Sequence, residues 1–214
     1  MGRDSDEKVI YHYINLVCWR EFFEHAGEFG QRTRIYCDSL SMLLVCKLLG
    51  ATGIIHKTGS TEIPRLKELM VGENLTVLSP YSVPFFQGCE IVVPPDLTNV
   101  SDYALEVSEC ISHGHTVAIG LSSPKQNFLG TELIKLRPDL EVICVGAVIP
   151  AFASERYRSQ VERRSNSGYE WCVHLARQPR RGLKKIAKTI RQALNVLLLR
   201  RGEFLRFARH LERK

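Results

Sequence analysis

Short apolar runs alternate with amphipathic stretches along most of this 214-residue chain, and this alternation restricts the fold more than any other feature. The apolar runs have the length of strands and are hydrophobic almost throughout, which is typical of strands buried on both faces of a parallel sheet. We expect strands at 34–40, 74–79, 89–95, 116–121 and 141–148, and helices at 41–50, 63–70, 101–114 and 124–136. The predicted fold is therefore α/β, a Rossmann-like, mostly parallel sheet with flanking helices.

Residues that commonly cap helices stand at the ends of two of these predicted helices. Ser101 is placed to cap the helix at 101–114, and Gly114 follows its last turn. Ser122 or Ser123 is placed to cap the helix at 124–136, with Pro124 at its first position, where a missing N–H group costs nothing.

Two polar stretches follow predicted strands, where a parallel sheet binds its ligands. They are Cys-Asp-Ser at 37–39 and Gly-Leu-Ser-Ser-Pro-Lys-Gln at 120–126. The second is either an ordinary turn or an anion site formed by helix N–H groups and Lys125. Asp38 is likewise either a helix cap or a general base. No glycine-rich phosphate-binding fingerprint is present, which disfavours a nicotinamide enzyme or a P-loop nucleotide hydrolase.

Charge divides the chain into two parts. Residues 156–214 hold 17 Lys and Arg against 4 Asp and Glu, whereas the first 155 residues hold 12 against 19. We therefore expect an α/β catalytic body at 1–155 and a basic helical appendage at 156–214. Such an appendage implies an anionic partner, a membrane surface or a nucleic acid.

From Leu183 onward, apolar residues recur with a helical period and basic residues fill much of the remainder. This pattern predicts a basic amphipathic helix, or a pair of helices divided near Gly202, of the kind that lies in membrane interfaces. Two alternatives remain open: packing of the apolar side on the body, and RNA binding. The latter is the least favoured, because the segment has only two aromatic residues for base stacking, so no nucleic-acid partner is expected.

The cysteines and histidines favour no metal site. Seven cysteines form no C-x-x-C pair, a pattern that fits reduced thiols in a cytosolic protein. The polar N-terminus predicts no signal peptide, and the run Val196–Leu199 is far too short to span a bilayer.

The ordered set of motifs resembles the WecG/TagA/CpsF glycosyltransferases, family 26 of the glycosyltransferases. The segment VAIGLSSPKQN is followed by CVGAVIPAFAS at 144–154 and GYEWCVHLARQPRR at 168–181. In the N-terminal half, YIN at 13–15, IYCDSLSMLL at 35–44 and HKTGSTEIPRL at 56–66 stand where the family has its own motifs. The resemblance extends over about residues 13–200, in the same order.

The resemblance implies an inverting transferase that moves a sugar from a UDP-sugar to a polyprenyl-diphosphate-linked sugar. The family acts on the cytoplasmic face of the membrane, needs no metal and has no other cofactor, and its products enter teichoic acid, capsule or exopolysaccharide. It implies Asp38 as the general base. The donor-binding residues that it implies are Asn15, Gly59, Lys125, Gln126 and Asn127. The residues of the appendage that it implies are Arg177, Arg180 and Arg181 for the diphosphate, and Glu170 and Trp171 as anchors to the body. The anionic inner membrane surface is a further expected partner, and an oligomer is possible.

The chain also departs from the family. His56 replaces an arginine, Thr61 an aspartate and Asn127 a glutamate, although Glu62 stands beside Thr61. These changes favour an unusual donor sugar. They leave open a catalytically weakened relative that serves as a membrane- or assembly-partner-binding module. Truncation after Arg181 is expected to leave a soluble body with little or no activity.

Overall fold

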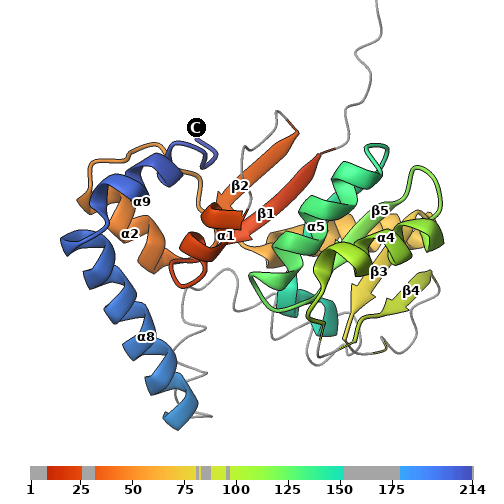
Figure 1. Ribbon diagram of the computed structural model, residues 1–214. Helices are drawn as coiled ribbons and strands as arrows, with labels where there is room; N and C mark the ends of the chain where they lie inside the picture. Colours follow the sequence, from red (N-terminus) through yellow and green to blue (C-terminus); the bar gives the residue numbers. More distant parts are fainter. Residues whose placement is uncertain are drawn as a thin grey trace, which may run out of the picture.

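Six parallel strands form a single sheet in the computed structural model, in the order β2-β1-β6-β5-β3-β4 (Figure 1). The structure describes residues 9–25, 32–80, 82, 88–94, 97–151 and 179–213. The strands are β1 (Ile10–Ile14), β2 (Thr33–Cys37), β3 (Leu75–Ser79), β4 (Cys89–Val92), β5 (Thr116–Ile119) and β6 (Glu141–Cys144). The predicted α/β fold with a parallel sheet is confirmed.

Helices flank the sheet and extend beyond its β2 edge (Figure 1). They are α1 (Trp19–His25), α2 (Leu40–Leu48), α3 (Ile63–Val71), α4 (Val100–Cys110), α5 (Lys125–Leu136), α8 (Pro179–Leu198) and α9 (Arg201–Ala208). Two short 3-10 helices, η1 (Gly59–Glu62) and η2 (Gly146–Ala151), precede α3 and follow β6.

Both faces of the sheet are covered, as the almost continuous hydrophobic runs predict. Side chains alternate between the two faces of a strand. In β1, Ile10 belongs to the apolar cluster formed with α4 and α5. Tyr11 and Tyr13 pack in the cluster formed with α3. The strands therefore end between two helical layers, and their carboxyl ends are the edge at which such a sheet binds ligands.

Helix α9 is part of the protein core. Phe204 and Phe207 are fully buried in one cluster with Trp19 and Phe22. The Trp19 ring lies edge-on to Phe204, with ring centres 5.1 Å apart. After α9 the chain runs along β2, where Glu212 N–H donates to the Ile35 carbonyl at 2.8 Å. Residues on both sides of the expected boundary at residue 155 therefore belong to one apolar core, and removal of residues 182–214 would expose that core.

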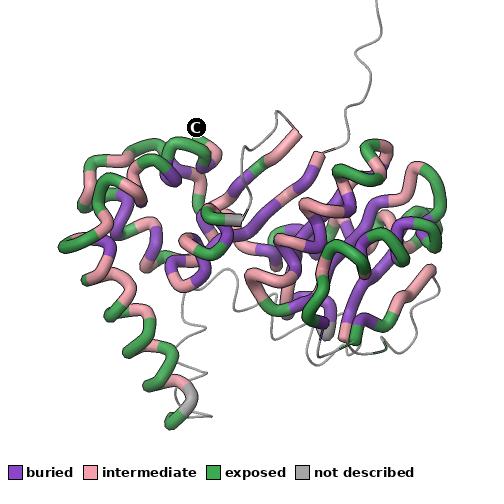
Figure 2. Tube along the Cα trace, viewed as in Figure 1, coloured by how far each residue is buried: buried purple, intermediate pink, exposed green. Residues whose placement is uncertain are grey.

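Helix α8, in contrast, is exposed along most of its length (Figure 2). It packs against α2 and α9, with Val196 as its one buried residue among the side chains described. Leu183, Ile190 and Leu194 are each more than half exposed. The predicted amphipathic pair is divided at 199–200, and Gly202 lies inside α9. In the part of the chain that the structure describes, no helix combines the length and hydropathy needed to cross a membrane.

Several element ends differ from the sequence prediction. Helix α4 begins at Val100, because the side chain of Asn99, not Ser101, accepts the N–H of Asp102 at 3.3 Å. It ends at Cys110, and Gly114 adopts φ 76° in the turn before β5. The strand expected at 141–148 stops at Cys144, because the chain turns into η2 at Gly146, with φ 60°.

Candidate functional site

Asp38 stands at the carboxyl end of β2 and is not the cap of the helix that follows. Its N–H group donates to the Ile14 carbonyl at 2.9 Å, which continues the pairing with β1 by one residue. Ser39 caps α2 instead, since Ser39 Oγ accepts the N–H of Met42 at 3.3 Å. The carboxylate of Asp38 is therefore not used to cap α2, which removes the simplest structural role for this residue.

Asn15 follows β1 on the same edge of the sheet. Its Oδ1 accepts the N–H groups of Val17 at 2.9 Å and Cys18 at 3.3 Å, which forms the turn into α1. Its amide oxygen thus has a structural role. The Nδ2 group makes no hydrogen bond with the described residues, and it is the part of this side chain that could serve a ligand.

Hydrogen-bonded polar side chains link the loop after β1 to the loop after β5. We call them the strand-end network; they are His12, Cys18, Ser123 and Asn127. Ser123 Oγ donates to Asn127 Oδ1 at 2.8 Å and lies 3.1 Å from Cys18 Sγ. Asn127 Nδ2 donates to His12 Nδ1 at 3.1 Å. Neither Ser123 nor Ser122 caps α5, whose cap residue Pro124 has no side-chain hydrogen bond.

The network changes the interpretation of Asn127. This residue has an exposed fraction of 0%, and its amide oxygen and amide nitrogen are both hydrogen-bonded, so it stabilises the loop after β5. The structure gives it no surface through which to contact a donor sugar. The charge of Asp38 nevertheless acts on the network at Cys18. Burial raises the pKa of the Cys18 thiol, and the negative charge of Asp38 raises it further.

His12 is buried and uncharged, and this predicts a pH dependence of stability. Burial lowers its pKa from 6.5 to about 3. Between these values the unfolded chain binds a proton that the folded chain does not, so the free energy of unfolding decreases as the pH falls, by at most about 1.4 kcal/mol per pH unit. Urea unfolding followed from about pH 7 to about pH 4 should show this slope.

His12→Gln is the matched variant, since glutamine keeps an acceptor for Asn127 but cannot take up a proton in this range. The variant is expected to be less stable near neutral pH and to have a flatter pH profile. His56, whose pKa burial also lowers, contributes equally to both proteins, so their difference isolates His12. Parallel profiles would contradict the prediction.

Gln126 offers an unsatisfied acceptor at the start of α5. It is 4% exposed, and its Oε1 has no hydrogen-bond partner among the described residues. The amide faces the turn after β6, where a Cβ on Gly146 would lie 3.3 Å from Oε1. A buried acceptor without a partner costs about 1–3 kcal/mol, so a donor from a ligand would be favoured here.

Lys125, one residue earlier, is oriented toward the loop before α4. Its Nζ donates to the Leu97 carbonyl at 2.9 Å and the side chain is half-buried. An ammonium group has three donors, so this contact fixes the position of the charge at the α5 N-terminus without using all of its hydrogen-bonding capacity.

Gly59 allows η1 to pack against the end of β6. It is buried, and a Cβ at this position would lie 2.9 Å from the Val145 carbonyl oxygen. Gly59→Ala should therefore lower the free energy of unfolding by about 1–3 kcal/mol, because backbone would have to move. Gly202→Ala is the control: nothing lies within 4 Å of its Cβ position inside α9. That change should raise stability by about 0.4–1 kcal/mol. Urea unfolding measures both, and equal effects would contradict the argument.

Glu62, which the sequence analysis did not select, is the centre of an ionic cluster with Tyr13, Lys57 and Arg65. It is 3% exposed, and its Oε1 lies 2.5 Å from both the Tyr13 hydroxyl and Lys57 Nζ. Arg65 lies 3.8 Å from Oε2. Burial and the Glu62 carboxylate raise the pKa of Tyr13, which stays a hydrogen-bond donor. The buried acid of this turn is thus Glu62, while Thr61 is exposed.

Lys57 connects this cluster to the end of β2, which Asp38 follows. Its N–H group donates to the Cys37 carbonyl at 3.1 Å, and its ammonium group lies 4.9 Å from the centre of the Tyr36 ring. Beside it, burial lowers the pKa of His56, and the main chain of Asp38 acts in the opposite direction. The Lys57 cation and His56 therefore lie beside the carboxyl end of β2. His56 is the residue that stands where the family pattern has an arginine.

The predicted residues of the appendage are only partly described. Glu170, Trp171 and Arg177 lie outside the described residues. Arg180 and Arg181 lie in the first turn of α8, where Arg180 is exposed.

Polar side chains form a row along the carboxyl ends of the strands, from Asp38 after β2, through Asn15 after β1, to Lys125 and Gln126 at the start of α5. Three strand spacings separate β2 from β5, which corresponds to about 14 Å. A ligand that contacts both the end of β2 and the loop after β5 must therefore be extended and lie across β1 and β6. In the described part of the chain, no group of three His, Cys, Asp or Glu side chains is placed to hold a metal ion.

Comparisons with known proteins add no relative: no family model, no curated protein and no solved structure matches the chain.

Proposed function

We propose that the protein is an inverting glycosyltransferase that transfers a sugar from a UDP-sugar to a polyprenyl-diphosphate-linked sugar in cell-surface polysaccharide assembly. The observation that carries the proposal is the position of Asp38, at the carboxyl edge of an all-parallel sheet with the capping role taken by Ser39. The order of motifs that resembles family 26 supports the same assignment.

In the proposed reaction, the acceptor hydroxyl oxygen bonds to the anomeric carbon of the donor sugar as the bond from that carbon to UDP breaks. The hydroxyl proton passes to the Asp38 carboxylate. The leaving diphosphate gains negative charge, which Lys125 and the arginines of the appendage would stabilise. The N–H groups of residues 126–128 do not contribute, because they already donate to the Ser122 and Pro124 carbonyl groups. Gln126 Oε1 would accept a hydrogen bond from the donor.

Helix α8 supports a peripheral position on the inner membrane surface. One side carries the exposed Leu183, Ile190 and Leu194, and Lys184, Lys185, Lys188 and Arg191 are exposed along the same helix. An exposed apolar stripe beside basic side chains fits the interface of an anionic membrane. This position would bring the strand ends close to a lipid-linked acceptor.

The test is acceptor-dependent release of UDP from a panel of UDP-sugars, with a short-chain polyprenyl-diphosphate sugar as acceptor. Release that requires both substrates would establish a transferase, and the best donor would identify the sugar. If no pair reacts, UDP binding is measured next. A chain that neither reacts nor binds UDP, but still binds anionic vesicles, would be a non-catalytic membrane-binding relative.

A further inference from the structure

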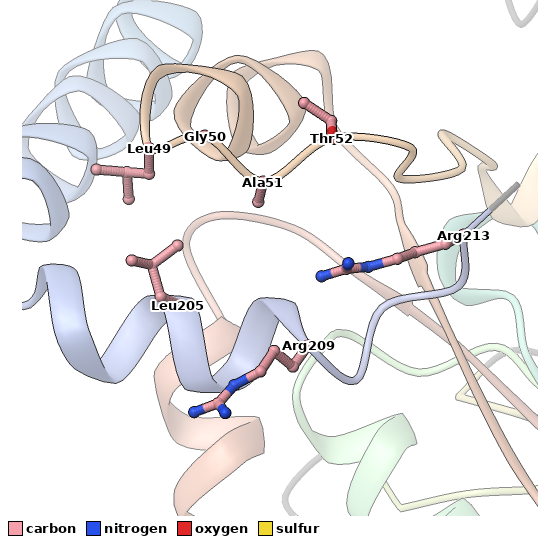
Figure 3. A pocket seen from close by; sticks show the side chains of 7 residues that line it. All are labelled: Leu49, Gly50, Ala51, Thr52, Leu205, Arg209 and Arg213. Carbon is pink, nitrogen blue, oxygen red and sulfur yellow. The ribbon is translucent and has the colours of Figure 1, made fainter.

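A cavity of about 290 Å³, largely open to solvent, lies between the end of α2 and α9 (Figure 3). It is on the side of the molecule away from α4 and α5 (Figure 1). Leu49, Ala51 and Leu205 give it an apolar lining. The Arg213 side chain extends into it from the C-terminal segment, and Arg209 also lines it, with its guanidinium group directed away from α2 (Figure 3). Gly50 and Thr52 complete the lining. None of these residues belongs to the strand-end site.

The charge of this cavity is entirely positive. No acidic residue lines it, and neither Arg209 nor Arg213 forms an ion pair with the described residues. The nearby carboxylates of Glu203 and Glu212 are paired elsewhere, with Arg200 and Arg34. Both arginines are exposed. Two guanidinium groups that have no carboxylate partner among the described residues and lie beside leucine side chains are suited to a group that combines negative charge with an apolar portion.

The arginines are not needed to cap α2. Three of the last four carbonyl groups of that helix, those of Val45, Cys46 and Lys47, already accept N–H groups of residues 49–51 at 2.9–3.2 Å. The local backbone therefore satisfies these three acceptors, and no described group accepts a hydrogen bond from either guanidinium group, each of which has five donors.

We propose that this cavity binds a phosphate group attached to an apolar chain. Guanidinium groups pair with phosphate oxygens in a two-pronged manner, and Leu49 and Leu205 would contact the adjoining alkyl carbons. The volume is just below the range for ligand pockets, about 300–1,000 Å³, which suits a headgroup and not a nucleotide-sugar.

Two sources supply this chemistry: a lipid headgroup in a membrane and a soluble phosphate ester. Leu48, next to Leu49 in the chain, is 64% exposed, and Leu198 and Leu199 at the end of α8 are 76% and 80% exposed. These side chains are suited to enter the apolar part of a bilayer while the cavity takes a headgroup, which would fix the orientation of the protein on the surface. This site is independent of the proposed transferase activity.

The experiment compares two double variants of the full chain with the same change in net charge. Arg209→Gln with Arg213→Gln removes both cations of the cavity, and Arg201→Gln with Arg206→Gln removes two exposed cations of α9 that do not line it. Co-sedimentation is measured with phosphatidylcholine vesicles containing phosphatidylglycerol and with phosphatidylcholine alone. Calorimetric titration with glycerol 3-phosphate forms the soluble arm, and thermal unfolding confirms that both variants fold.

We expect the cavity variant to bind the anionic vesicles about tenfold more weakly than the α9 variant, as the loss of paired guanidinium–phosphate contacts requires. Binding of glycerol 3-phosphate that only the cavity variant loses, with unchanged vesicle binding, would keep the phosphate site and make a soluble ester its ligand. Equal losses of vesicle binding in the two variants would mean that charge alone attracts the membrane and would overturn the proposal. It would also fail if the wild type bound neither probe.

Discussion

Asp38→Asn is expected to lower the rate of acceptor-dependent UDP release by about 10²–10⁴-fold, the contribution that a positioned general base usually makes. Asparagine has the same shape but cannot take the proton of the acceptor hydroxyl. Asp38 N–H bonds Ile14 and the cap of α2 belongs to Ser39, so the substitution leaves the local backbone contacts in place. UDP binding and thermal unfolding should be close to those of the wild type.

Ser39→Ala is the matched control one residue further along. It removes the cap of α2 and should cost about 1 kcal/mol of stability, but it removes no proton acceptor, so activity should persist. If Asp38→Asn turned over at the wild-type rate, the protein could remain a transferase but its base would be another residue. If Ser39→Ala lost activity to the same degree, the effect at position 38 would be one of backbone position and not of proton transfer.

The sequence pattern predicts the sheet well where strands are apolar throughout and poorly where they are aromatic. Strands β3 and β5 are uniformly buried, and their hydrophobic runs predict them. Strand β1, with sequence IYHYI, was not among the expected strands although it lies inside the sheet. Its tyrosine and histidine side chains are polar in sequence but buried or half-buried in the fold, where Tyr13 pairs with Glu62 and His12 with Asn127.

The candidate site could be predicted in part for the same reason. Asp38 lies at the end of an expected strand, so the fold class alone places it at the carboxyl edge of the sheet. Asn15 follows β1, which was not expected, so only the resemblance indicated it. Leu97, which accepts from Lys125, is 28 residues away, and His12, one partner of Asn127, is 115 residues away; no local pattern indicates either contact. Glu62 has the appearance of an ordinary helix-start acid, and only its burial against Tyr13 and Lys57 distinguishes it.

The C-terminal segment shows how one charge pattern can conceal two structural roles. Both α8 and α9 are basic and amphipathic in sequence, which predicted a single appendage. In the structure, α8 is exposed whereas α9 contributes Phe204 and Phe207 to the core. The difference depends on aromatic residues at positions 204 and 207, one turn apart, which meet Trp19 and Phe22 of a helix about 180 residues earlier.

Phe207→Ala should lower the free energy of unfolding by about 3–5 kcal/mol, the usual cost of removing a buried aromatic ring. The ring has an exposed fraction of 0% and lies 5.7 Å from Trp19 and 5.7 Å from Phe23, measured between ring centres. Because small domains are stable by only about 5–15 kcal/mol, this loss is a large part of the total. Urea unfolding followed by tryptophan fluorescence measures it, with Trp19 as a reporter inside the cluster.

Leu199→Ala is the control, since that side chain is 80% exposed in the same segment and its loss should change stability by less than about 0.5 kcal/mol. The same reasoning alters the expectation for truncation after Arg181. The shortened chain lacks Phe204, Phe207 and Leu211, so it should be unfolded or aggregated, and lost activity in it would say nothing about the membrane. Separate tests of α8 therefore need substitutions at its exposed residues. If Phe207→Ala were as stable as Leu199→Ala, α9 would not be docked in solution, and truncation would again be a valid test of the whole segment.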